Sequence, residues 1–289
     1  MTGIDIMVKI IKFLVVLFGI YFSVYSKTYK GAEYRTHDTF TYGRFEVRYK
    51  SSIGPGQTST FFTYHELGGE GTDAWNEIDI EVLGRYDNDV QFNPITPGQQ
   101  NHVYHQQVDF DPADDFHVYA FEWTPEYVAW FIDGVEMHRQ TGEHIEALDR
   151  GQKIMMNIWP PAYQNWVGIL DPATLPKFAY YDYVSYAAHT PGSGDAGTDN
   201  NFTLQWKDDF DSWDKNRWGK ATHTFVGNNC DFIKDNAVFR DGNLILCLTD
   251  GTNTGYTDKN PPIPQGAWYD GHQIQIEFSE PVLKASAEN

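Results

Sequence analysis

A short acidic motif is the strongest chemical signal in the sequence. Residues 75–84 read WNEIDIEVLG, in which Glu77, Asp79 and Glu81 alternate with two isoleucines. On a β-strand this alternation places the three carboxyls on one face and the isoleucines on the other. Neighbouring carboxylates repel one another, which raises the pKa of at least one of them. A carboxylic acid with a raised pKa beside an ionised carboxylate is the pair that hydrolysis of a glycosidic bond requires.

The same spacing has a plainer interpretation, a solvent-facing strand of an acidic protein. A short motif alone is weakly specific, and the chain has 40 acidic against 21 basic residues. Geometry adds a condition, because the Cα atoms of Glu77 and Glu81 lie roughly 13 Å apart on a straight strand. A retaining glycosidase holds its two carboxyls only ~5–5.5 Å apart. Catalysis therefore predicts that this strand curls on a concave sheet.

The composition limits the class of ligand. A net charge of -19 argues against nucleic acids, anionic membranes and acidic polysaccharides as partners, and leaves neutral, hydroxyl-rich ligands compatible. The length of 289 residues suits one large β-domain or two ordinary domains. Aromatic residues make up 16% of the chain, which argues against general disorder.

The elements that must position the acids are predicted to be strands. Residues 44–50, RFEVRYK, alternate strictly between apolar and charged side chains, as a half-buried strand does. Further strands are expected over 116–123, 127–132 and 178–186, and a hairpin over 236–249. Convincing amphipathic helices are absent, and only 144–150 suggests one. Many short strands with Gly and Pro turns predict an all-β sandwich or barrel.

Residues 1–26 have the pattern of a signal peptide. Lysines precede an apolar run over 13–22 that is too short to span a bilayer, and Val24 and Ser26 suit a cleavage site. An uncleaved membrane anchor is the alternative. No later stretch is long enough to cross a membrane. We therefore expect a secreted, extracellular protein with no membrane contact after cleavage.

The C-terminal part divides into three segments. Residues 190–201, TPGSGDAGTDNN, have linker composition. Residues 202–250 are too few to bury a core of their own without disulfides. They are expected to complete sheets begun before the linker, so that 27–250 forms one domain. The tail, 251–289, is expected to be poorly ordered.

WNEIDIEVLG resembles the active-site strand of the family-16 glycoside hydrolases. The absence of an extra residue before the last Glu resembles the lichenases, which are endo-β-1,3-1,4-glucanases; laminarinases, agarases and carrageenases usually carry E-x-D-x-x-E. Six further segments resemble lichenase segments in the same order. They are GAEYR (31–35), YGRFEVRYK (42–50), FFTY (61–64), VQFN (90–93), FHVYAFEWTPEYVAWFIDG (116–134) and KIMMNIW (153–159).

The order of the two halves resembles the circularly permuted lichenases. In ordinary lichenases the segment similar to 202–250 comes first, whereas here it follows the linker. The resemblance implies a circularly permuted, concanavalin A-like β-jelly-roll sandwich of two antiparallel sheets. The substrate cleft would lie on the concave face, and the protein is expected to be a monomer.

The resemblance also implies roles for individual residues. Glu77 matches the nucleophile, Glu81 the general acid/base, and Asp79 the middle residue that tunes both, which implies double displacement without a catalytic cofactor. Taken singly, each binding position has a structural alternative, such as core packing or a surface ion pair. The matching substrate-binding positions are Glu33, Arg35, Phe62, Tyr64, Trp75, Gln91, Asn93, His105, Asn157, Trp159 and Trp166. His223 departs from the family, because permuted relatives have a Trp there.

Two structural features follow from the resemblance. A family calcium site that contributes to stability is matched by Asp182 as its side-chain ligand and by Asp209 and Gly242 as donors of backbone carbonyls; a plain turn and a strand-edge Asp are the alternative. Cys230 matches a disulfide cysteine whose partner position is Gly31 here, so that bridge cannot form. Since the 236–249 hairpin pairs Cys247 near 236 rather than near 230, two buried thiols are expected.

The resemblance implies hydrolysis of β-1,4 bonds in mixed-linkage β-1,3-1,4-glucan, a neutral polysaccharide. A β-1,3-glucanase or a glucan transglycosylase on the same scaffold is the enzyme alternative. A non-catalytic β-glucan-binding module is the alternative without enzyme activity. Such modules typically lose the acids, so the intact set of Glu77, Asp79 and Glu81 argues against it.

Overall fold

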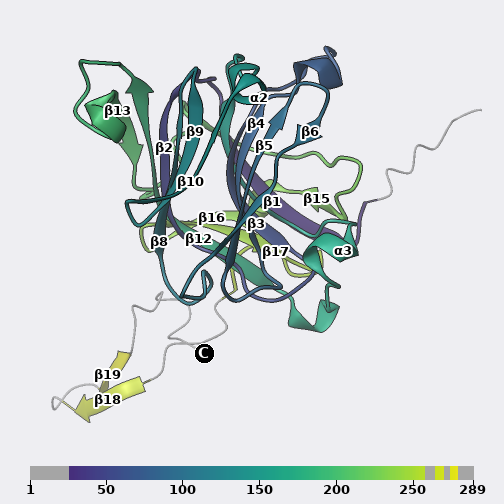
Figure 1. The fold of residues 1–289 in the computed structure, drawn as a ribbon. Helices are drawn as coiled ribbons and strands as arrows, with labels where there is room; N and C mark the ends of the chain where they lie inside the picture. The colour runs from purple at the N-terminus through teal and green to yellow at the C-terminus, as the bar shows by residue number, and fades with distance from the viewer. Residues whose placement is uncertain (1–25, 258–263, 270–273, 279–289) are drawn as a thin grey trace, which may run out of the picture.

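Two β-sheets packed face to face form the body of the molecule (Figure 1). The computed structural model describes residues 26–257, 264–269 and 274–278. The signal peptide expected over 1–26 therefore lies, except for Ser26, outside the described residues. No helix in the described part of the chain is long and apolar enough to cross a membrane.

The first sheet, here called the cleft sheet, carries the acidic motif on a central strand. All of its pairings are antiparallel except that of β15 with β1. In order across the sheet, its strands are β14 (Trp218–Lys220), β1 (Tyr29–Thr36), β11 (Lys153–Trp159), β3 (Thr58–Tyr64), β4 (Glu77–Leu83), β5 (Asp89–Thr96) and β6 (Gln100–Asn101), with β15 (Cys230–Phe232) beside β1 and β7 (Tyr104–Gln107) beside β5.

The second sheet, here called the outer sheet, is antiparallel throughout and covers the back of the cleft sheet. Its strands in order are β10 (Val135–Thr141), β9 (Tyr127–Ile132), β8 (His117–Trp123), β2 (Gly43–Lys50), β12 (Lys177–His189), β17 (Asn243–Leu248) and β16 (Ala237–Arg240), with β13 (Phe202–Asp208) beside β12. The strands expected over 44–50, 116–123, 127–132 and 178–186, and the 236–249 hairpin, are confirmed. The expected helix is short, since α2 covers only Glu143–Glu146; α3 (Gln164–Val167) was not predicted.

The alternating patterns explain how the sheets pack. Phe45, Val47 and Tyr49 of β2 are fully buried, as are Ile78 and Ile80 of β4. Their apolar faces meet between the sheets, because removing apolar surface from water drives the association. The isoleucines thus face the core and leave the acids on the opposite face of β4.

Aromatic contacts across the core hold the acidic strand in place. The ring of Trp130 on β9 stacks on Phe92 of β5, with centroids 5.4 Å apart. The Trp130 Nε1–H also donates a hydrogen bond to the backbone oxygen of Asp79 at 3.1 Å. The outer sheet therefore fixes the backbone of β4 at the middle acid.

The segment after the linker contributes strands to both sheets. β13, β16 and β17 join the outer sheet, whereas β14 and β15 join the cleft sheet (Figure 1). The linker is tied to the outer sheet, where the Thr198 backbone N–H donates to the buried Glu122 Oε1 at 3.0 Å. Cys230 and Cys247 are both buried free thiols, as expected.

The tail contains a hairpin that the sequence analysis did not predict. β18 (Pro264–Tyr269) and β19 (Ile274–Phe278) pair antiparallel in a separate two-stranded sheet.

Candidate active site

Three rows of side chains cross one face of the cleft sheet. Because every second residue of a strand faces the same side, the strand register decides which side chains are neighbours. The first row runs His105, Gln91, Glu81, Thr60, Asn157 and Glu33 across β7, β5, β4, β3, β11 and β1. The second runs Asn93, Asp79, Phe62, Met155 and Arg35, and the third Ile95, Glu77, Tyr64 and Lys153.

These rows form the floor of a cleft with a volume of about 910 Å³. The three acids and all eleven predicted substrate-binding residues line it. Aromatic rings and amide side chains both line it, which suits a sugar, because rings bury its C–H faces and amides bind its hydroxyls.

Glu77 lies where a tryptophan supports its ionised form. The Trp75 Nε1–H donates to Glu77 Oε2 at 2.7 Å, and the Tyr64 ring meets the Trp75 ring edge-on at 5.8 Å. Burial raises the pKa of Glu77 to about 7, while hydrogen bonds from Trp75 and with Asp79 oppose the rise. The negative charge of Glu33 raises it further.

The surroundings of Glu81 favour its protonated form. Burial, followed by repulsion from Glu77, raises the pKa of Glu81 to about 8, and a hydrogen bond from Gln91 Nε2 opposes this rise. Gln91 is itself oriented by Trp166, whose Nε1–H donates to Gln91 Oε1 at 3.0 Å. Burial and the charge of Glu77 thus favour the form of Glu81 that can donate a proton.

Asp79 connects the two outer acids. Its side chain is buried, and burial together with the charges of Glu77 and Glu81 raises its pKa well above the usual range. Protonated Asp79 hydrogen-bonds to Glu77, whereas Asn93 opposes the rise by stabilising the carboxylate. This set can hold one ionised oxygen at Glu77 and one transferable proton at Glu81, as acid-assisted nucleophilic displacement needs.

A buried carboxyl lies at the β1 end of the first row. Burial raises the pKa of Glu33 to about 7 even though the Arg35 guanidinium lies 3.7 Å from its Oε1. Arg35 also pairs with Glu66 at 2.9 Å. Beside Glu33, Asn157 is oriented by the Thr60 hydroxyl, which donates to Asn157 Oδ1 at 2.6 Å.

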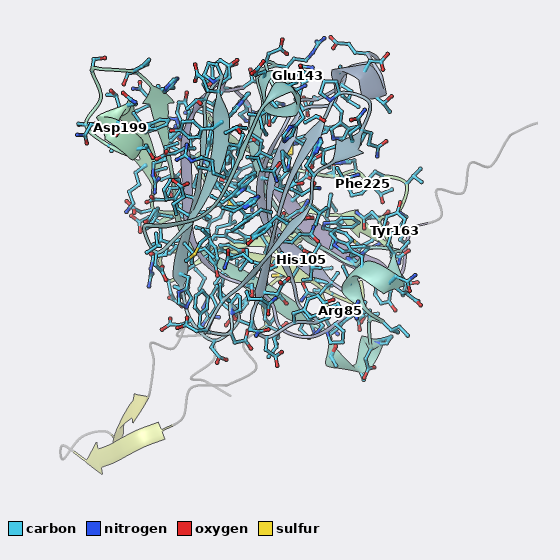
Figure 2. The ribbon with its side chains drawn as sticks, in the orientation of Figure 1. Arg85, His105, Glu143, Tyr163, Asp199 and Phe225 are labelled. Carbon is cyan, nitrogen blue, oxygen red and sulfur yellow. The ribbon has the colours of Figure 1, made fainter. Side chains whose placement is uncertain are left out.

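Several cleft residues escaped the sequence analysis. Thr60 and Met155 share the two-residue period of their strands, so that alternation could have identified them. Tyr163, Phe225 and Val226 come from loops, where no period points to them. Figure 2 shows Tyr163 and Phe225 at the same edge of the molecule. His223, which departs from the family pattern, also lines the cleft.

The predicted calcium ligands lie near one junction of the outer sheet. β12 pairs with β13 as far as Asp208 and with β17 from Leu244, which brings Asp182, Asp209 and Gly242 to neighbouring positions. Asp182, the expected side-chain ligand, is already paired with a cation of the chain, because Arg48 Nη1 lies 2.7 Å from its Oδ2. No group of three His, Cys, Asp or Glu side chains suited to a metal was found among the described residues. In this arrangement the carboxylate of Asp182 is engaged by Arg48 and does not fit a calcium ion.

Two stacked sheets with three clustered carboxyls in a cleft lined by aromatic rings are an arrangement suited to a glycoside hydrolase. The family model "Glycosyl hydrolases family 16" matches residues 19–184, and the chain belongs to that family. The Beta-glucanase of Fibrobacter succinogenes is 39% identical over 254 residues, covering 84% of this chain and 71% of the relative. The Beta-glucanase of Brevibacillus brevis is 39% identical over 162 residues, covering 56% and 61%. A lichenase structure derived from a mouse hindgut metagenome aligns at 44% identity and a TM-score of 0.48, covering 53% of this chain and 70% of that one.

Proposed function

We propose that this chain is a retaining endo-1,3-1,4-β-D-glucanase that hydrolyses β-1,4 bonds in mixed-linkage β-glucan. One observation carries the proposal: Glu77, Asp79 and Glu81 lie on one face of β4 in a cleft lined by aromatic and amide side chains, where the Trp75 Nε1–H donates to Glu77 Oε2 at 2.7 Å. The Trp75 hydrogen bond supports an ionised Glu77 as the nucleophile, and burial beside Glu77 supports a protonated Glu81 as the proton donor. Membership of family 16 and relatives named beta-glucanase support the same assignment.

The first step forms a covalent intermediate. A Glu77 oxygen attacks the anomeric carbon while Glu81 transfers its proton to the glycosidic oxygen, and the C–O bond to the leaving sugar breaks. The Trp75 hydrogen bond orients the attacking carboxylate. Asp79, protonated and bonded to Glu77, limits the build-up of negative charge on the strand.

The second step returns the enzyme to its starting state. Glu81, now ionised, accepts a proton from water as the water oxygen attacks the anomeric carbon. The ester bond to Glu77 breaks, so Glu77 leaves as a carboxylate and Glu81 is again protonated. Two inversions at one carbon give net retention, and the step sequence requires no cofactor.

We further propose that 27–250 is a single, circularly permuted catalytic domain of a secreted, monomeric protein. Strands on both sides of the linker fill both sheets, which supports one domain. The Fibrobacter relative matches 84% of the chain, whereas the Brevibacillus relative matches 56%, which supports a permuted order shared with the former. Residues 1–26 are proposed as the export signal. Calcium is no part of this proposal, because Arg48 occupies Asp182, the expected side-chain ligand.

Reducing-sugar release from barley mixed-linkage β-glucan, measured beside laminarin, tests the function. We expect release from barley glucan alone and none from the Glu77→Ala variant, which should still bind the polymer. Equal or faster release from laminarin would instead identify a β-1,3-glucanase. Products longer than the substrate would identify a transglycosylase. Binding without release by the unmodified chain would identify a binding module.

A further inference from the structure

The loop over 222–229 forms one wall of the cleft and presents an unusual apolar tip. Val226 is 96% exposed and Phe225 is 40% exposed, and both line the cleft. Exposed apolar side chains at a binding site mark a surface that is covered when the ligand is bound. The C–H face of a sugar ring offers a matching apolar surface for these two side chains.

This tip packs on a second loop. The Ala162 N–H donates to the Gly227 oxygen at 2.7 Å, and the Asn229 N–H donates to the Pro160 oxygen at 3.0 Å. A side chain at Gly227 would lie 2.7 Å from the Tyr163 hydroxyl. Tyr163, Phe225 and Val226 therefore form one continuous rim, here called the apolar rim.

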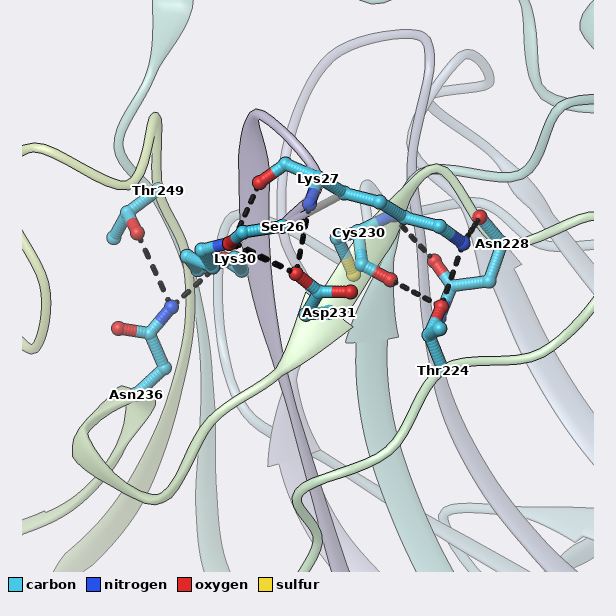
Figure 3. Close-up of polar contacts among 9 residues, drawn as sticks. All are labelled: Ser26, Lys27, Lys30, Thr224, Asn228, Cys230, Asp231, Asn236 and Thr249. Atoms are coloured by element: carbon cyan, nitrogen blue, oxygen red, sulfur yellow. Dashed lines mark hydrogen bonds and ion pairs between the residues drawn. The ribbon is translucent and has the colours of Figure 1, made fainter. Parts of the chain in front are cut away.

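The base of the same loop is held by the segment that precedes β1 (Figure 3). The Lys27 ammonium donates to the Thr224 hydroxyl at 2.6 Å and to the Asn228 oxygen. These two residues flank the tip on either side. The Thr224 hydroxyl in turn donates to the Cys230 oxygen at 2.7 Å, which fastens the loop to β15.

A carboxylate fixes the position of Lys27 itself. The Lys27 backbone N–H donates to Asp231 Oδ2 at 2.8 Å, and the Lys30 ammonium donates to the same oxygen at 2.8 Å. Lys27 thus has its backbone anchored on β15 and its side chain extended to the loop. Hydrogen bonds to a charged group are stronger than neutral ones, so this ammonium adds to the backbone hydrogen bonds that also hold the loop.

We propose that the apolar rim is a glucan-contacting surface and that Lys27 is a positioning residue which holds it in its bound form. The inference rests on the proposed function and adds a specificity element outside the catalytic strand. A pre-ordered loop loses less conformational freedom when substrate binds, so that its loss weakens binding rather than the chemical step.

The kinetic test uses Lys27→Met in the mature chain, residues 27–289, and the change keeps an unbranched side chain of similar length while removing its charge. We expect the KM for barley glucan to rise about three- to tenfold with kcat within about twofold of the unmodified chain. Lys27→Arg should restore KM. Lys50→Met is the matched control, because the Lys50 ammonium lies over the Phe116 and Tyr180 rings on the outer sheet. It should change neither constant.

A double-mutant cycle links Lys27 to the rim. Phe225→Ala with Val226→Ser should raise KM by a similar factor, and adding Lys27→Met should raise it little further, because both changes remove one contact surface. An unchanged KM in Lys27→Met, a fall in kcat of the same size, or fully additive effects would overturn the inference. Affinity electrophoresis of the same variants in a Glu77→Ala background measures glucan binding without turnover. Failure of the proposed hydrolysis is therefore distinguishable from failure of the rim.

Discussion

Replacing Trp75 with Phe tests how the protein keeps Glu77 ionised. The change keeps an aromatic ring against Tyr64 but removes the Nε1–H that donates to Glu77 Oε2 at 2.7 Å. This hydrogen bond lowers the pKa of Glu77 against the effect of burial. A hydrogen bond to a charged group contributes about 1.5–3 kcal/mol, or roughly one to two pKa units.

The expected result is a shift of the acid limb of the pH–rate profile. In the unmodified chain, kcat/KM should rise through a pKa of about 7 as Glu77 ionises and fall above about 8 as Glu81 loses its proton. Because the carboxyls titrate together, each limb reports an apparent pKa of the coupled set. In Trp75→Phe the acid limb should move about one unit toward alkaline pH, so that kcat/KM at pH 6 falls about tenfold.

The assay is kcat/KM for barley glucan measured from pH 5 to 9. Trp159→Phe is the matched control, because Trp159 lines the same cleft and packs on Phe225 at 5.0 Å. It should alter KM and leave the acid limb in place. An unshifted acid limb in Trp75→Phe would refute the assignment of that limb to Glu77.

Three further predictions concern stability. The pKa of Glu81 in the folded chain is raised above its unfolded value, so the free energy of unfolding falls as pH rises from about 4.5 toward 8. At pH 9, urea unfolding should therefore show Glu81→Gln to be about 1–3 kcal/mol more stable than the unmodified chain. At pH 4 the variant should show no such gain. Glu122 is fully buried and pairs with Arg44 at 2.9 Å, so Glu122→Ala should cost about 3–5 kcal/mol by urea unfolding; a loss below about 1 kcal/mol would contradict this role. Because Arg48 occupies Asp182, millimolar calcium should change Tm by less than about 2 °C in a thermal melt, whereas a larger rise would show that calcium displaces the arginine.

Much of the site could be predicted because the two-residue period of a strand decides which side chains face the cleft. Alternation in WNEIDIEVLG assigns Ile78 and Ile80 to the core and the acids to the cleft, and the structure has this arrangement. Side chains alternate in the same way along the other strands of the cleft sheet, so the predicted binding residues on β1, β3, β5 and β11 share one face.

Features that depend on loops and on long-range contacts could not be predicted in this way. Phe225 and Val226 lie in a polar loop with no period, and their place in the cleft depends on Lys27, about two hundred positions away in the chain. The pairing of Asp182 with Arg48 depends on the register of β12 against β2. Only the folded arrangement shows that this cation competes with the predicted calcium.

The stereochemistry of the first product tests the central claim most directly. Proton NMR during hydrolysis of a mixed-linkage oligosaccharide distinguishes the two anomers before they interconvert. Double displacement through Glu77 predicts that the newly formed reducing end appears first as the β-anomer. An initial α-anomer would mean single displacement by water, with carboxyls too far apart for a covalent intermediate, and would contradict the assignment of Glu77 as nucleophile.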